Sequence, residues 1–129
     1  MAFKDLVIRS QLIPPRQPKG VLRRPRLETR LAEMAAAEAE SFIGKPYVYQ
    51  FEWDDAKIYC SELIYKAYQR GAGVMVGSRH RIRDLDWKPH EEYIRKQAGG
   101  DLPLDRSLIT PAELVRSPFT TILYNNFPE

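Results

Sequence analysis

The pattern of apolar and polar positions predicts one long amphipathic helix in the first half of the chain. From Pro25 to about Ile43, apolar side chains recur at helical spacing, with alanines between them and glutamates on the opposite face. Gly44 followed by Pro46 is a strong signal that the helix ends there. The expected buried stripe of this helix consists of Leu27, Leu31, Met34 and Phe42.

A second helix is expected after an aromatic segment. Residues 47–53 carry an aromatic side chain at every second position, which is typical of a strand or of an extended loop. Asp54 and Asp55 can cap or precede the helix, which should continue to the breaker at residues 71–73. Its apolar positions are Leu63, Ile64, Ala67 and Tyr68. Cys60 therefore falls in the first turns of this helix.

The remaining elements are expected to be short and to be bounded by turns. Short strands are predicted at residues 19–24, 74–76 and 119–124. Pro89 can open a helix that ends at Gly99, and residues 79–87 should form an irregular charged connection. Thr110 and Pro111 combine an N-cap hydroxyl with a proline at the first helical position, so another helix should begin there and end before Pro118.

Length and composition narrow the class of protein. A chain of 129 residues fits one domain, so we expect residues 1–129 to form a single domain. No stretch approaches the roughly 18 consecutive apolar residues that a membrane span requires. Residues 1–11 are too short and too charged for a secretory signal peptide, so a cytoplasmic location is the default expectation. Cys60 is the one cysteine in the sequence and cannot form an internal disulfide, which agrees with a reducing compartment.

The net charge of +3 is unevenly distributed along the chain. The two basic clusters are Arg16, Lys19, Arg23, Arg24, Arg26 and Arg30, and then Arg79, His80, Arg81 and Arg83. A basic protein that binds nucleic acid or an acidic polymer through such clusters is one hypothesis. No aromatic residues alternate with these arginines to stack bases, and no known nucleic-acid motif surrounds them. We therefore expect solvated surface and no specific nucleic-acid binding.

The candidate for chemistry is the thiol of Cys60. A thiol near the start of a helix meets unpaired backbone N–H groups, which favour the thiolate and can also hold an oxyanion. A cysteine hydrolase further needs a histidine to accept and return the proton, and usually a polar residue to orient that histidine. Free cysteines are often buried packing residues, so a structural Cys60 is the alternative reading. His80 and His90 are the two histidines of the chain, and both follow Cys60.

Three segments around this cysteine resemble one family of enzymes. They are Gly44–Tyr47 (GKPY), Phe51–Asp55 (FEWDD) and Lys57–Leu63 (KIYCSEL), with weaker similarity at residues 102–105 and 109–111. Together they resemble the YiiX/YebB-like family of permuted papain-like cysteine hydrolases, in the NlpC/P60 superfamily. The resemblance implies an α+β fold with helices packed on a small antiparallel sheet. It also implies that the chain is the C-terminal, Cys-bearing part of a larger papain-like domain.

By this resemblance Cys60 is the nucleophile of an amidase, peptidase or acyl hydrolase that works through a thioester. The implied substrates are small peptides, peptidoglycan fragments or lipid acyl groups, and no cofactor or metal is expected. In relatives the histidine strand precedes the cysteine helix, whereas no histidine precedes Cys60 here. The alternative is a truncated or degenerate relative that acts at most as a binding module. Such a relative would have an incomplete sheet, which favours self-association.

Other candidate groups have simpler explanations. The adjacent carboxylates Asp54–Asp55 and Glu91–Glu92 suggest helix capping and solvation before they suggest a metal site. Glu62 and Lys66 are four residues apart, which is typical of an exposed helical ion pair. The aromatic series of residues 47–53 is more typical of core than of a substrate platform, although one of its rings could line an acyl site.

Overall fold

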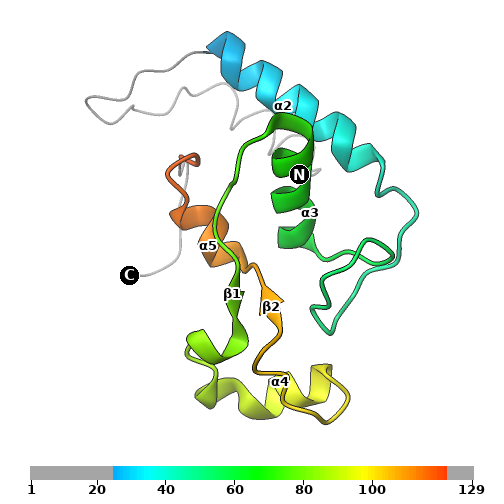
Figure 1. The fold of residues 1–129 in the computed structure, drawn as a ribbon, viewed down its shortest axis with the longest axis vertical. Helices are drawn as coiled ribbons and strands as arrows, with labels where there is room; N and C mark the ends of the chain where they lie inside the picture. Colours follow the sequence, from blue (N-terminus) through cyan, green and yellow to red (C-terminus); the bar gives the residue numbers. More distant parts are fainter. Residues whose placement is uncertain (1–24, 122–129) are drawn as a thin grey trace, which may run out of the picture. The chain divides into compact units, whose positions relative to one another are not determined.

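A computed structural model describes residues 25–121 of the chain (Figure 1). The α-helices are α2 (Pro25–Glu40), α3 (Cys60–Lys66), α4 (Glu91–Gln97) and α5 (Pro111–Arg116). A π-helix, η1 (Ala67–Ala72), continues α3, and two 3-10 turns are η2 (Ile82–Asp84) and η3 (Lys88–His90). The strands are β1 (His80–Arg81) and β2 (Ser107–Leu108). Within the described residues, no helix is both long and apolar enough to cross a lipid bilayer.

Helix α2 forms where the helical pattern predicts it and packs mainly against η1. The expected buried stripe is confirmed at Phe42, which is buried. It is wrong at Leu27 and Met34, which are exposed, and Ala35 is buried instead. The reason is the close approach of the two helices. A side chain at Gly71 would clash with the backbone of Met34 and would lie 3.0 Å from Cβ of Glu38. Small residues at this crossing let the backbones approach, so a larger side chain such as Met34 lies beside the contact instead of within it.

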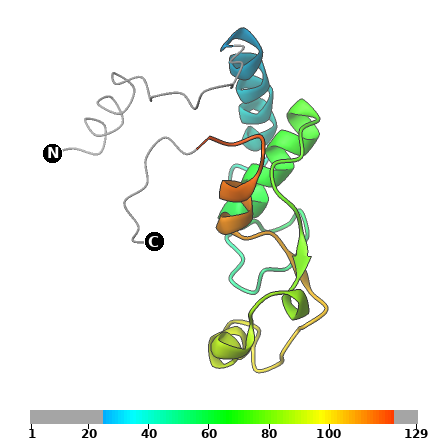
Figure 2. The same cartoon turned by 90° about the vertical axis from the view of Figure 1, so that its left-hand side faces the viewer.

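The sheet of the described residues consists of two short antiparallel strands. His80 is paired with Leu108, and Arg81 with Ser107. Backbone hydrogen bonds from Ile82 to Arg106 (3.1 Å) and from Arg83 to Leu104 (3.0 Å) extend this ribbon. Helix α4 lies at the far end of the ribbon from α2 in both views (Figure 1 and Figure 2).

Two predicted strands differ from the structure. Residues 74–76 form no strand, and the segment expected to be an irregular charged connection supplies β1 instead. Of these three residues, Val76 is buried, whereas Val74 and Met75 are not. Pairing between backbones far apart in sequence, rather than apolar composition, decided which segment is a strand. Residues 119–121 also form no strand. The remainder of that prediction, and the strand expected at residues 19–24, lie outside the described residues.

The predicted short helices are confirmed, with their capping signals. The hydroxyl of Thr110 accepts a hydrogen bond from the backbone N–H of Glu113 (3.4 Å), and Pro111 occupies the first turn of α5. Pro89 lies in η3, immediately before α4. Residues 47–53 form neither a strand nor a fully extended loop, because the chain bends at Tyr49 and Gln50 and Phe51 has a positive φ of 54°.

The core joins the cysteine helix to the sheet. Its buried members are Val48, Tyr59, Tyr65, Ile82, Leu108 and Ile109. They come from the aromatic loop, from α3 and the residue before it, and from the segments that form and follow β1 and β2. Helix α5 lies beside α3 in both views (Figure 1 and Figure 2). The start of α3 is therefore held by segments that are distant in sequence.

We expect Gly71→Ala to destabilise the chain, although alanine normally favours a helix over glycine by about 0.5–1 kcal/mol. The added methyl group would meet the backbone of Met34, and either α2 or η1 would have to move. Overpacking of this kind costs about 1–3 kcal/mol. Urea unfolding of the full chain measures the effect, with Gln69→Ala on the exposed face of η1 as the control. An increase in stability would contradict the close approach of the two helices.

Candidate active site

Cys60 is the first residue of α3, as the sequence predicts, and it is exposed. Tyr59, the residue before it, has an extended backbone (φ −113°, ψ 165°), so the chain turns into the helix at the cysteine. The backbone N–H of Leu63 donates to the carbonyl oxygen of Tyr59 (2.9 Å) and closes the first turn. The structure thus places the thiol at a surface, where a dissolved substrate can reach it, and not in the core.

The two sequence neighbours of Cys60, Tyr59 and Ser61, are both buried and are both hydrogen-bonded to Ile109. The hydroxyl of Tyr59 accepts a hydrogen bond from the backbone N–H of Ile109 (3.1 Å), and the hydroxyl of Ser61 donates to the carbonyl oxygen of Ile109 (2.8 Å). Both polar groups of the Ile109 backbone are therefore satisfied by side chains on either side of the cysteine. Burial raises the pKa of Tyr59 to about 12, so its phenol stays protonated at neutral pH. This double contact fixes the backbone at Cys60 against the segment that follows β2.

Tyr47 is the residue whose side chain interacts electrostatically with the thiol of Cys60. An isolated parallel bridge joins Tyr47 to Ile58, through hydrogen bonds from Val48 to Ile58 (3.3 Å) and from Ile58 to Pro46 (3.1 Å). The pKa of Tyr47 is raised, first by burial and then by the charge and the hydrogen-bonding side chain of Cys60 beside it. The pKa of Tyr47 thus responds to Cys60, although the tyrosine is half exposed.

The rest of the aromatic series divides into two groups. The Tyr49 ring contacts that of Tyr47, with 4.9 Å between centroids, and both residues are exposed. Phe51 and Trp53 pack edge-on against the core tyrosines Tyr59 and Tyr65, with 5.4 and 5.6 Å between centroids. The expectation that these aromatics form core is confirmed for the second pair and is wrong for the first.

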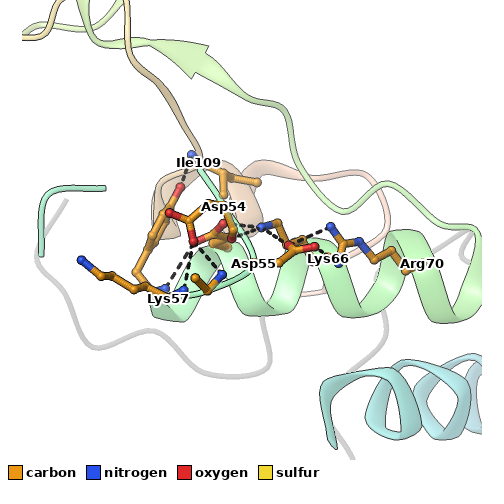
Figure 3. Close-up of polar contacts among 9 residues, drawn as sticks. Asp54, Asp55, Lys57, Lys66, Arg70 and Ile109 are labelled. Atoms are coloured by element: carbon orange, nitrogen blue, oxygen red, sulfur yellow. Dashed lines mark hydrogen bonds and ion pairs between the residues drawn. The ribbon is translucent and has the colours of Figure 1, made fainter. Parts of the chain in front are cut away.

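A group of charged residues connects the cysteine helix to the loop that precedes it. The ammonium group of Lys66 donates to Oε1 of Glu62 (2.5 Å), to Oδ1 of Asp55 (2.8 Å) and to the carbonyl oxygen of Asp54 (2.6 Å). Figure 3 shows these contacts, with Arg70 continuing the row along the helix. We call Lys66, Glu62, Asp55 and the Asp54 carbonyl the Lys66 cluster. Glu62 and Lys66 are 0% and 1% exposed, so the expectation of an exposed helical pair is wrong.

The Lys66 cluster is fully hydrogen-bonded. The second oxygen of Glu62 accepts the backbone N–H of Tyr59 (3.3 Å), and the Lys66 ammonium lies 4.7 Å from the centroid of the Trp53 ring. Arg70 makes a two-fold hydrogen bond to Asp55, 3.0 Å at each oxygen. Burial raises the pKa of Glu62, and the hydrogen bonds from Lys66 partly oppose that effect. Each charged group of the cluster therefore has a hydrogen-bonded partner, which a buried ion pair requires.

The two histidines are engaged elsewhere. His80 lies in β1, with Nε2 3.1 Å from Oε2 of Glu113, and His90 is the residue before α4. The sequence suggested that neighbouring arginines dominate the surroundings of His80, whereas the structure gives it a carboxylate partner from α5. In the described part of the chain, no hydrogen bond joins either histidine to Cys60.

The other carboxylates make local contacts, and Asp54 caps no helix, although capping was expected. Oδ1 of Asp54 accepts the backbone N–H groups of Ala56 (2.7 Å) and Lys57 (3.0 Å), which is a local turn, and Glu91 pairs with Arg95 on α4. Among residues 25–121, no group of three or more histidine, cysteine, aspartate or glutamate side chains is placed to hold a metal ion.

Sequence reasoning missed the Lys66 cluster and the electrostatic interaction of Tyr47 with Cys60. The signal for the first was present: both charges lie in the segment that follows the cysteine, interleaved with apolar positions on one helical face. Exposed helical ion pairs share that spacing, so the spacing alone did not distinguish a buried pair. The signal for the second was the tyrosine of the GKPY segment, whose position depends on the bridge to Ile58.

Comparison with known proteins identifies one family and two similar proteins. A sequence profile described as "Permuted papain-like amidase enzyme, YaeF/YiiX, C92 family" matches residues 10–124. The uncharacterized protein YiiX of Escherichia coli strain K12 is 28% identical over 104 residues, which cover 79% of this chain and 52% of that protein. A crystal structure described as the metalloprotein yiiX from Escherichia coli O157:H7 has a TM-score of 0.67 and 28% identity. The similarity covers 85% of this chain and 59% of that one, so the chain spans about half the length of the relatives it matches.

Removing the Tyr59 hydroxyl should destabilise the chain. In Tyr59→Phe the buried N–H of Ile109 loses its acceptor, which costs about 1–3 kcal/mol of unfolding free energy. Urea unfolding of the full chain at neutral pH measures this loss. Tyr93→Phe removes an exposed hydroxyl and should change the unfolding free energy by less than about 0.5 kcal/mol. Equal effects of the two substitutions would show that the hydrogen bond to Ile109 is not formed.

Asp55 should make the chain sensitive to acid. Hydrogen bonds from Arg70 and then from Lys66 lower the pKa of Asp55 to about 2, from an ordinary value of 3.8. A carboxyl whose folded-state pKa is lowered contributes stability above pH 3.8, and this contribution is lost as the pH falls through about 2. Urea unfolding between pH 5 and pH 2 should therefore show a shallower pH dependence in Asp55→Asn than in the unmodified chain. The exposed Asp101→Asn serves as control, and an unchanged slope in Asp55→Asn would exclude the linkage.

Proposed function

Because this chain belongs to the permuted papain-like amidase family, we propose that Cys60 is the nucleophile of an acyl-transfer reaction on an amide or ester. The observation that carries the proposal is the position of Cys60. Its thiol is exposed at the first turn of α3, while both neighbouring residues are buried and hydrogen-bonded to Ile109. An exposed sulfur on a fixed backbone is what an incoming carbonyl group requires.

The reaction would proceed in two steps. In the first, Sγ of Cys60 bonds to the carbonyl carbon, the carbonyl electrons move to oxygen, and collapse of the tetrahedral adduct breaks the bond to the leaving amine or alcohol. The leaving group takes a proton, and the acyl group remains as a thioester. In the second step, water attacks the thioester, the carboxylic acid is released, and the thiol is restored.

Tyr47 is the group of this chain that can act beside the sulfur. Its phenol is a hydrogen-bond donor whose pKa is raised from the ordinary 10.0 by burial and by Cys60, so it is protonated at neutral pH. We assign to it the stabilisation of the negative charge that develops on the carbonyl oxygen. The exposed ring of Tyr49 extends this surface and would contact the acyl part of a substrate.

Proton transfer needs a histidine that these contacts do not supply. His80 is paired with Glu113, and no histidine precedes Cys60 in the sequence. We therefore assign the proton transfers to a histidine of polypeptide beyond these 129 residues, with this chain as the Cys-bearing part of a larger papain-like domain. The described residues present no donor set that fits a metal ion, so no step is assigned to a metal. Small peptides, peptidoglycan fragments and lipid acyl groups are the proposed substrates.

The absence of a histidine at Cys60 within residues 25–121 favours a second candidate function. In this case the chain is a non-catalytic relative that binds such molecules on the surface around Cys60, Tyr47 and Tyr49. The two-stranded sheet and the exposed apolar side chains near the site, such as Ile64 at 43% exposure, would then favour self-association.

Acylation of the full chain by p-nitrophenyl acetate distinguishes the two candidates, because this activated ester needs no acid to protonate its leaving group. We expect a burst of p-nitrophenolate that approaches one equivalent per chain, and a mass increase of one acetyl group on Cys60. Cys60→Ala should abolish both. An equal burst in Cys60→Ala would refute Cys60 as the nucleophile, and no burst in either protein would support the binding module.

A further inference from the structure

The aromatic residues of the loop before α3 are divided between the core and the surface. In an extended segment, side chains two positions apart lie on the same face, so the four aromatic side chains of residues 47–53 would all point the same way. The structure separates them into two pairs. Phe51 and Trp53 pack against core tyrosines. Tyr47 and Tyr49 are 49% and 66% exposed, so the backbone changes direction between the two pairs.

This change of direction is a left-handed turn at Phe51. The chain bends at Tyr49 and Gln50, and Phe51 is the one non-glycine residue within residues 25–121 that has a positive φ (54°). Such a backbone conformation is costly for a bulky residue and persists only where surrounding contacts hold it. One contact is a hydrogen bond from Nη1 of Arg106 to the carbonyl oxygen of Gln50 (2.7 Å). The other is the Phe51 ring, which packs edge-on against Tyr59 with 5.4 Å between centroids.

Arg106 attaches the turn to the sheet. It lies directly before β2, and its carbonyl oxygen accepts the backbone N–H of Ile82 (3.1 Å) in the extension of the ribbon. Its guanidinium group therefore joins the ribbon to a turn 56 positions away in sequence. The same ribbon leads into Ile109, which is hydrogen-bonded to both sequence neighbours of Cys60. The turn and the start of α3 thus share one support.

Burial of aromatic surface does not explain this turn. An extended segment without strain would keep the four aromatic side chains on one face, toward the core. The turn instead leaves two tyrosine rings together at the surface, with 4.9 Å between centroids and 55° between planes. The backbone of Tyr47 is bridged to Ile58, two residues before the exposed Cys60. A strained turn therefore produces an exposed aromatic pair close to the start of the cysteine helix.

We propose that the turn at Phe51, held by Arg106, presents the Tyr47–Tyr49 pair as a subsite for an apolar acyl group of a substrate that reacts at Cys60. Tyrosine rings on a rigid support offer a large contact area at a small cost in conformational entropy. The inference rests on the proposed function, because it names the acyl groups that the same nucleophile would prefer: aryl or long alkyl groups over acetyl. Arg106 is a positioning residue in this assignment, since it contacts the loop and not the substrate.

The test measures how fast the full chain is alkylated at Cys60 by two maleimides. Cys60 is the one cysteine of the sequence, so each rate reports this thiol alone. N-benzylmaleimide carries an aromatic group that the tyrosine pair can contact, whereas N-ethylmaleimide carries none. The benzyl-to-ethyl ratio of rates, divided by the same ratio for glutathione, should be about 2- to 10-fold lower in Tyr49→Ala than in the unmodified chain. Tyr93→Ala removes an exposed tyrosine of α4 and should leave the ratio unchanged.

Substitutions at the turn separate positioning from contact. Arg106→Met removes the donor to Gln50 and keeps an apolar stem, so the ratio should fall as it does in Tyr49→Ala. Arg106→Lys can still donate a hydrogen bond and should restore part of the ratio. Phe51→Gly and Phe51→Ala both lose the ring, but glycine adopts a positive φ readily. Phe51→Gly should therefore unfold at a higher urea concentration than Phe51→Ala, and the reverse order would overturn the strained turn.

The outcomes separate this inference from the proposed function. Maleimide ratios that stay unchanged in Tyr49→Ala and Arg106→Met overturn the subsite and its positioning residue. Burst rates with p-nitrophenyl phenylacetate and p-nitrophenyl acetate, each divided by the rate with a free thiol, should show the same preference for the aromatic group, and equal values overturn the acyl assignment. If neither ester gives a burst that depends on Cys60, the proposed function fails. The maleimide ratios then still decide whether the tyrosine pair is a binding surface that Arg106 holds in place.

Discussion

The buried ammonium group of Lys66 is the constraint on which the site depends. A lysine that is 1% exposed needs partners for its charge and its donors, and Glu62, Asp55 and the Asp54 carbonyl provide them. Meeting this requirement bends the aromatic loop back onto α3 and brings Trp53 against the lysine. The loop that carries Tyr47 therefore returns to the start of the same helix. Without these partners the lysine would have to leave the core, and the loop would lose its attachment.

The second constraint is the backbone of Ile109, which connects the site to the sheet. Tyr59 and Ser61 bind its N–H and its carbonyl oxygen from the two sides of Cys60. Ile109 directly follows β2, so the pairing of β2 with β1 fixes the position of Ile109. Through its two hydrogen bonds, Ile109 in turn fixes the position of the start of α3. The start of α3 is thus held both by the Lys66 cluster and by the sheet. Cys60 itself stays exposed at this fixed point.

Local signals predicted the helices well because they act within a few residues. Gly44 and Pro46 ended the first helical pattern, and Thr110 capped α5 as its hydroxyl predicted. The strands were predicted poorly. Residues 74–76 had the right composition and formed no ladder, whereas His80 and Arg81 formed one because the segment around Ser107 lies opposite them. A strand of two residues is defined by its partner, and its own sequence carries little information.

The sequence by itself determined the helical segments, the position of Cys60 at the start of a helix and the resemblance to permuted papain-like hydrolases. Each of these depends on neighbouring residues, through capping, periodicity or a contiguous motif. Tertiary structure alone decided that Glu62 and Lys66 are buried, that the pKa of Tyr47 responds to Cys60 and that His80 is paired with Glu113. The contacts that fix Cys60 join residues 48 and 50 positions apart in sequence. Burial and proximity over such separations follow from the packing of the whole core, which no local pattern specifies.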